Sequence, residues 1–188
     1  MELFESYLLI AQEVLITGIN WRKQSDSYFS TFSCYGPPNQ CCYQASKTIV
    51  EQFEVTTDRT HSIDITVLAN PSTDYNTLSA TGNFETGLEY LKTTIKANKQ
   101  GGQPVVIGVH YTKNTAPFNA NKATYHFVVV VGKGYDREKR KHYFRFYDVG
   151  KPNGTNPSFK LYVDEGKKEI MGYSEDRLYT VTEVRQNY

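Results

Sequence analysis

The chain has 188 residues and a formal net charge of +1, from 21 basic and 20 acidic side chains. This length suits one domain built around a single core. The near balance of charge leaves no source for the electrostatic attraction to phosphate on which nucleic-acid binding depends. We therefore predict one domain over residues 1–188 and no nucleic-acid partner.

The first predicted element is an amphipathic helix over about residues 2–17, where apolar residues recur at helical spacing. This segment starts acidic and lacks the basic lead and small-residue cleavage site of a signal peptide. No apolar run approaches the roughly 18 residues that a membrane span requires. We expect no membrane insertion, and either a cytosolic location or export by a route that reads no signal peptide. The chain is equally compatible with being a module of a longer polypeptide.

All three cysteines, Cys34, Cys41 and Cys42, lie close together in the sequence. Adjacent cysteines are poorly placed to pair with each other, and a framework of structural disulfides would spread its cysteines along the chain. We expect free thiols, with pairing of Cys34 to either neighbour as the alternative in an oxidising setting. No Cys-x-x-Cys or His-x-x-x-His spacing is present, so we predict neither a metal nor a cofactor.

A loop rich in turn residues, at positions 36–40, gives way to an amphipathic helix predicted over about residues 41–54. This places a thiol at a helix N-terminus, where partial positive charge and free N–H groups favour the thiolate and can hold an oxyanion. Such a position suits a nucleophile. The alternative is a small apolar side chain buried at the start of a helix.

A second core helix is predicted from Asn83 to about Ile95, ending near two glycines. Alternating and apolar runs predict strands at about 104–111, 126–132, 142–148, 159–163 and 178–184. Helices followed by an antiparallel sheet indicate an α+β fold. We expect the helix that carries the thiol to pack against this sheet.

His126 opens the second of these strands, and Asp148 ends the third. A short charged connection centred near Arg137 predicts an antiparallel hairpin, and folding it at that point sets position 126 opposite position 148. Opposed side chains on one face have Cβ atoms about 4.5–5.5 Å apart. We therefore expect the Asp148 carboxylate to hold the His126 imidazole in one tautomer and to stabilise its protonated form.

The order Cys, His, Asp resembles that of the papain-like cysteine peptidase and amidase superfamily, over roughly residues 36–150. Residues 40–45, Gln-Cys-Cys-Tyr-Gln-Ala, are similar to the Gln-Cys-x-aromatic-x-Ala element of CHAP-type peptidoglycan amidases, which makes Cys41 the nucleophile. Residues 42–46 look like the Cys-Gly-Pro-Ala-Ser/Ala element of bacteriocin-leader-cleaving peptidases, which makes it Cys42. Tyr125 and Val149 depart from the family, which often has Gly before the His and Pro after the Asp.

The helix face favours Cys42. In this superfamily the residues three and seven positions after the nucleophile point into the core, and after Cys42 these are Ala45 and Ile49. Cys41 stays as the alternative nucleophile. The resemblance also suggests Gln40 as an oxyanion donor, although the family's glutamine usually lies farther from the cysteine.

The resemblance implies a papain-like fold, with N-terminal helices packed on an antiparallel β-sheet, and a cysteine hydrolase that cleaves an amide bond through Cys42, His126 and Asp148. It suggests a bacterial peptidoglycan amidase or endopeptidase acting as a toxin or effector. Its expected partners are a peptide or peptidoglycan substrate and a neutralising immunity or inhibitor protein. Two alternatives remain: a transglutaminase-like thiol acyltransferase, and a non-catalytic module that binds a peptide or glycan.

Overall fold

The computed structural model describes residues 13–28, 41–113, 117, 119, 121 and 123–188. In chain order the elements are β1 (Val14–Leu15), α2 (Cys42–Val50), η3 (Glu51–Phe53), η4 (Arg59–His61), β2 (Ser62–Asp64), β3 (Thr66–Leu68), β4 (Leu78–Ala80), α3 (Phe84–Thr94), η5 (Asn98–Gln100), β5 (Val105–His110), β6 (His126–Asp136), β7 (Lys141–Tyr147), β8 (Lys160–Asp164), β9 (Glu169–Ser174) and β10 (Arg177–Arg185). Both helices predicted beyond residue 40 are confirmed, as α2 and α3.

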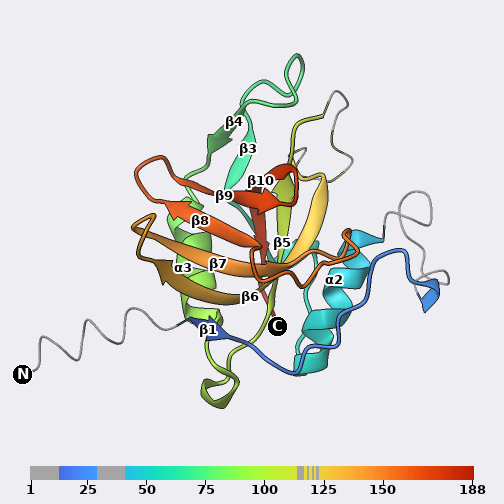
Figure 1. The fold of residues 1–188 in the computed structure, drawn as a ribbon. Coiled ribbons are helices and arrows are strands. Elements are labelled where there is room, and N and C mark those ends of the chain that lie inside the picture. Colours follow the sequence, from blue (N-terminus) through green and yellow to red (C-terminus); the bar gives the residue numbers. More distant parts are fainter. Residues whose placement is uncertain (1–12, 29–40, 114–116, 118, 120, 122) are drawn as a thin grey trace, which may run out of the picture.

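Six antiparallel strands close into a barrel. Each strand from β5 to β10 pairs with the next along the chain, and β10 returns to pair with β5. β2 adds to β10, while β3 and β4 form a separate hairpin that projects from the barrel (Figure 1). Closure removes the two unpaired edges that an open sheet of these strands would expose.

The prediction of a papain-like α+β fold, with helices packed on an open sheet, is wrong. The described part of the chain is mainly this barrel, with only two short α-helices of 9 and 11 residues. Of the six barrel pairings, the sequence predicted the hairpin that joins β6 to β7. The pairing that closes the barrel joins β5 to β10, which are far apart in the chain. The periodicity of apolar residues within one segment does not predict which distant segment will pair with it.

β9 is absent from the predicted strands, because Gly172 lies in its middle and a glycine often marks a turn between elements. The glycine has a packing reason instead. A Cβ at this position would lie 1.9 Å from the carbonyl oxygen of Lys160 on the neighbouring strand. Only a residue without a side chain allows β8 and β9 to approach this closely.

The predicted N-terminal helix is also wrong where the structure describes it. Val14 and Leu15 form β1, which pairs with Lys133 and Gly132 of β6, beyond the pairing of Val130 with the first residue of β5. The backbone N–H of Ile16 continues this pairing by donating to Val131. Backbone groups of β6 that β5 leaves unpaired are thereby satisfied, which outweighs the helical spacing of the apolar residues. Residues 2–12 lie outside the described part.

Two cores lie on opposite faces of β5 and β6. Val128 and Val130 of β6 face the barrel interior, where they join the apolar face of α3. Phe127 and Val129 face outward and pack against α2. Figure 1 shows α2 and α3 on different sides of the barrel. Neither of these helices has the length and apolarity that crossing a membrane would require.

Candidate active site

Three of the predicted residues meet at one end of the barrel. Cys42 is the first residue of α2, His126 is the first residue of β6, and Asp148 directly follows β7. The imidazole Nε2 lies 2.8 Å from Asp148 Oδ1, and the Cys42 thiol forms a hydrogen bond with the same imidazole. Because Nε2 is engaged by the carboxylate, Nδ1 is the ring nitrogen left to face the sulfur. The three side chains therefore form one hydrogen-bonded chain.

The predicted hairpin register is wrong, although the predicted contact between His126 and Asp148 is confirmed. The turn lies later than expected, with Asp136 opposite Lys141, and this shift alone would set His126 and Asp148 on different faces. A register shift between Val130 and Gly132 inserts one extra residue into β6. This bulge shifts β6 by one residue and returns the His126 and Asp148 side chains to the same face of the sheet. Both point toward the barrel interior, where they meet.

The electrostatics of the pair favour a charged thiol and a charged imidazole. Burial alone raises the pKa of the Cys42 thiol, but hydrogen bonds and the charge of His126 outweigh it and leave the pKa below its ordinary value. Burial likewise opposes charge on His126, yet hydrogen bonds with Asp148 and Cys42 raise its pKa to about 10. Both shifts favour a thiolate beside an imidazolium, which is the reactive state of a nucleophilic cysteine.

We expect the rate at which iodoacetamide alkylates Cys42 to fall less between pH 8 and about pH 6 than the rate for a free cysteine, because the pKa of this thiol is lowered. The rate for a free cysteine falls about tenfold for each pH unit below its thiol pKa, because only the thiolate reacts. Mass spectrometry of the alkylated peptide measures this rate. The His126→Ala variant should regain the steep pH dependence of a free thiol, and a steep dependence in the unaltered protein would contradict the ion pair.

Two backbone N–H groups add to this environment, one in α2 and one in β6. The N–H groups of Tyr43 and Phe127 both donate to the Cys42 sulfur, and the side chain of the preceding residue, Cys41, does not cap the helix. Uncapped N–H groups at a helix N-terminus stabilise negative charge. Groups of this kind also stabilise oxyanions.

The other two residues predicted to belong to the site are Cys41 and Gln40, and the part of the chain that the structure describes includes only Cys41. Cys41 is disulfide-bonded and buried, so it has no thiol with which to attack, whereas Cys42 is a free, half-buried thiol. The expectation of free thiols throughout is therefore wrong for Cys41. The choice of Cys42 from its helix face agrees with this geometry. Gln40, the suggested oxyanion donor, and Cys34 lie outside the described residues.

Asp148 is held by groups that the sequence analysis missed. Its Oδ2 accepts hydrogen bonds from Ser174 Oγ at 2.6 Å and from Tyr179 Oη at 3.0 Å, and its Oδ1 also accepts from the backbone N–H of Gly150. Burial opposes the charge on Asp148, but the hydrogen bond and the charge of His126, followed by the bonds from Ser174 and Gly150, lower its pKa to about 2. No local motif marks Ser174 or Tyr179, since they come from β9 and β10, the strands whose place in the barrel was not predicted.

Gly150 is also required by the space around the imidazole. A Cβ there would lie 3.0 Å from His126 Cε1 and 3.1 Å from Asp148 Oδ1. The backbone therefore passes against the edge of the histidine and the carboxylate together. This close approach restricts the imidazole to the orientation that faces both Asp148 and Cys42.

We expect Tyr179→Phe and Ser174→Ala each to lower kcat about three- to tenfold with little change in KM. Each substitution removes one bond that orients Asp148, and so acts on the imidazole without touching substrate. Steady-state kinetics with a cleavable peptide or peptidoglycan fragment measures the two parameters. Tyr162→Phe is a matched control, because that hydroxyl also donates to an aspartate, Asp136, but at the other end of the barrel. An unchanged kcat in both site variants would contradict the orienting role.

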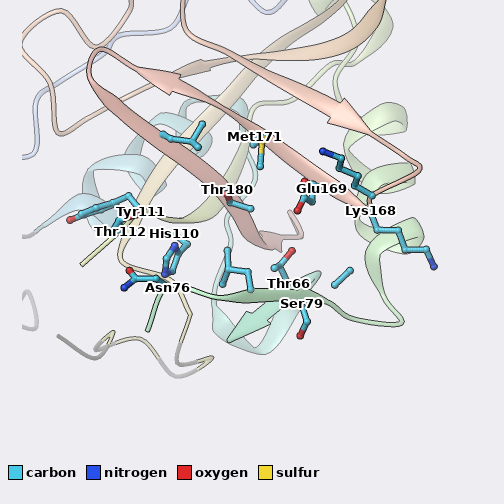
Figure 2. A pocket seen from close by; sticks show the side chains of 14 residues that line it. Thr66, Asn76, Ser79, His110, Tyr111, Thr112, Lys168, Glu169, Met171 and Thr180 are labelled. Carbon is cyan, nitrogen blue, oxygen red and sulfur yellow. The ribbon is translucent and has the colours of Figure 1, made fainter. Parts of the chain in front are cut away.

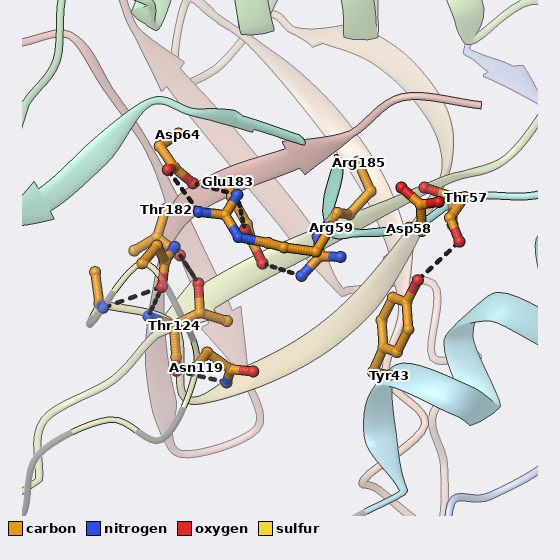
Figure 3. A network of polar contacts seen from close by, with 12 residues as sticks. Tyr43, Thr57, Asp58, Arg59, Asp64, Asn119, Thr124, Thr182, Glu183 and Arg185 are labelled. Carbon is orange, nitrogen blue, oxygen red and sulfur yellow. Dashed lines mark hydrogen bonds and ion pairs between the residues drawn. The ribbon is translucent and has the colours of Figure 1, made fainter. Parts of the chain in front are cut away.

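A network of polar contacts connects α2 to the segment around Thr57 and to β10 (Figure 3). Tyr43 donates its hydroxyl to the carbonyl oxygen of Thr57, and the Arg185 guanidinium lies 4.9 Å from the centre of the Tyr43 ring and 5.0 Å from that of Phe127. Arg185 in turn bonds to the buried Glu183, which Arg59 also approaches. The two residues whose N–H groups reach the sulfur are thus fixed by a buried cation.

Comparisons of this chain with protein-family models, with curated proteins and with solved structures found no match. Within the described part of the chain, no three His, Cys, Asp or Glu side chains gather as a metal site would require. The chemistry of this site is therefore argued from its own geometry.

Proposed function

We propose that the protein is a cysteine hydrolase that cleaves an amide bond. The observation that carries this proposal is the hydrogen-bonded chain of Cys42, His126 and Asp148 at the N-terminus of α2. A half-buried thiolate beside a charged imidazole, with N–H groups aimed at the sulfur, has the parts that acyl transfer through a thioester needs.

In the first half of the proposed reaction the Cys42 thiolate attacks the carbonyl carbon of the scissile amide. The oxyanion that forms is stabilised by N–H groups at the start of α2. As the carbon–nitrogen bond breaks, the imidazolium of His126 gives its Nδ1 proton to the leaving amine. An acyl thioester on Cys42 and a neutral imidazole remain.

In the second half a water molecule attacks the thioester carbonyl while His126 takes one of its protons. The carbon–sulfur bond breaks, the acid product leaves, and the thiolate and imidazolium are restored. Asp148 stays ionised throughout, because its pKa of about 2 lies far below neutral pH. Its role is to orient the imidazole and to stabilise the protonated form.

The substrate proposed for the first test is the stem peptide of bacterial peptidoglycan, with the protein acting as a toxin or effector that an immunity protein neutralises. This choice is supported by the similarity of residues 40–45 to the cysteine element of CHAP-type amidases. It is an argument from resemblance and is independent of the site geometry, so a different peptide substrate would leave the proposed chemistry intact.

The proposed function is tested by incubating the protein with purified peptidoglycan and with a random peptide library in water enriched in ¹⁸O. Hydrolysis places one ¹⁸O atom in each new carboxyl group, which mass spectrometry detects. A labelled primary amine is present in a parallel reaction. Conjugates with that amine and no ¹⁸O product would identify an acyltransferase, and the absence of any product from either substrate would overturn the proposal.

A further inference from the structure

A row of aromatic rings leads away from the catalytic imidazole. The Tyr179 ring centre lies 5.9 Å from that of His126, the Tyr111 ring lies 5.8 Å from Tyr179, and the Tyr125 ring lies 5.3 Å from Tyr111. Tyr111 directly follows β5 and Tyr125 directly precedes β6. Both are half-buried, so each presents part of its ring to solvent beside the catalytic end of the barrel.

Two cations lie on these rings. Lys113 Nζ is 5.4 Å from the centres of both Tyr111 and Tyr125, and the Arg177 guanidinium carbon is 4.9 Å from the centre of Tyr111. Both side chains are exposed. The contacts fix the two positive charges in place while leaving their hydrogen-bond donors available.

In the described part of the chain neither cation forms an ion pair with a carboxylate, although the charge of Arg177 contributes to lowering the pKa of Asp176. Asp176, the sequence neighbour of Arg177, lies instead 3.4 Å from Lys151, which Glu175 also pairs with. Two like charges held on one ring repel each other, and an anion bound between them offsets this repulsion. The arrangement is therefore complementary to a negatively charged ligand.

A cavity of about 440 Å³ continues from this cluster along the outer face of β9 and β10. Figure 2 shows Tyr111 and His110 at one end of it and Lys168 and Glu169 at the other. Leu178, 41% exposed, contributes an apolar surface to its wall. An extended chain that reaches the catalytic end would find both apolar and polar contacts beyond the cations.

We propose that Tyr111, Tyr125, Lys113 and Arg177 form a subsite that binds a carboxylate-bearing residue of the peptide substrate, close to the scissile bond. The inference rests on the proposed function for its location beside Cys42. A planar guanidinium and an ammonium donate hydrogen bonds to a carboxylate, and the rings pack against the peptide. A nucleic acid would need many more phosphate contacts than two cations on a chain of net charge +1 supply.

Binding is tested with the Cys42→Ala protein immobilised, so that no peptide is cleaved. Two random hexapeptide libraries, one with glutamate fixed at the third position and one with glutamine there, are applied as an equimolar mixture. Mass spectrometry measures the ratio retained. We expect about a fivefold preference for glutamate at low salt, typical of an exposed charge contact, and a ratio near one when Lys113→Gln and Arg177→Gln are added.

Lys139→Gln is the matched control, because Lys139 lies 4.1 Å over the Tyr162 ring but at the opposite end of the barrel. It should leave the preference unchanged. Equal retention of the two libraries, or a preference that survives loss of both cations, would overturn the subsite.

The same libraries, given to the unaltered protein, separate this inference from the function on which it rests. If the glutamate library is cleaved about fivefold faster, both proposals are supported. Cleavage without any preference overturns the subsite alone. Retention of the glutamate library without any cleavage keeps the anionic subsite as a binding site and overturns the hydrolase.

Discussion

Cys42→Ala is expected to lower the rate of amide cleavage by at least about 10⁴-fold, to the background of the assay. The substitution removes the only described thiol that is free, so no acyl thioester can form. Initial rates on the substrate found in the ¹⁸O experiment measure the loss. Cys42 is half-buried at the start of α2, and removal of one sulfur atom there should cost little stability.

Two further measurements make this result specific. Thermal unfolding followed by circular dichroism should give a similar Tm for the variant and the unaltered protein, which shows that the fold is retained. His126→Ala should cause a comparable loss of rate. The double variant should lose no more, because the effects of substituting residues that act as one unit are not additive. Substantial activity in folded Cys42→Ala protein would show that another group is the nucleophile.

Asp148→Asn is expected to lower kcat about 10²- to 10⁴-fold while the protein stays folded. The amide can still occupy the space between Ser174, Tyr179 and Gly150, but it carries no charge to stabilise the imidazolium. The pKa of His126 should therefore fall, and the iodoacetamide rate at about pH 6 should fall with it. Asp176→Asn is the matched control, since this carboxylate also lies at the catalytic end but is 86% exposed and pairs with Lys151.

The same variant should change how stability depends on pH. The folded-state pKa of Asp148, about 2, lies below its ordinary value of 3.8. The contribution of Asp148 to the free energy of unfolding is therefore fully present above pH 3.8 and is lost as the pH falls toward about 2. The unaltered protein should lose about 2 kcal/mol of unfolding free energy across that range that Asp148→Asn does not lose. Urea unfolding at several pH values measures the difference, and parallel curves for the two proteins would contradict the shifted pKa.

The site could be predicted from the sequence to the extent that it depends on local pattern. The turn residues before position 41 and the apolar stripe through Ala45 and Ile49 correctly predicted a helix with a cysteine at its start. Alternation in the two following strands correctly placed His126 and Asp148 on the same face of one hairpin. It did so despite a wrong register, because the bulge within β6 compensated for the misplaced turn.

The rest depended on contacts that pattern does not record. Ser174 and Tyr179 reach Asp148 only because β9 and β10 belong to the same closed sheet, and Gly172 made β9 look like a connection. The bonding state of Cys41, which removes it as a nucleophile, depends on which cysteines meet in space. A rule based on local sequence does not predict which of two adjacent cysteines forms a disulfide.

The sequence alone determined the helix that presents the thiol, the two strands that bear its imidazole and carboxylate, and the absence of a large charge imbalance. These features follow from the spacing of apolar and polar residues over a few positions, because helices and strands repeat their side-chain directions over such short distances. Only the tertiary structure decided that the strands close into a barrel, that Cys42 is the free thiol beside His126 and that β9 and β10 hold the aspartate. Such choices depend on which of many similar apolar segments pack together, and that competition is settled by the free energy of the whole chain.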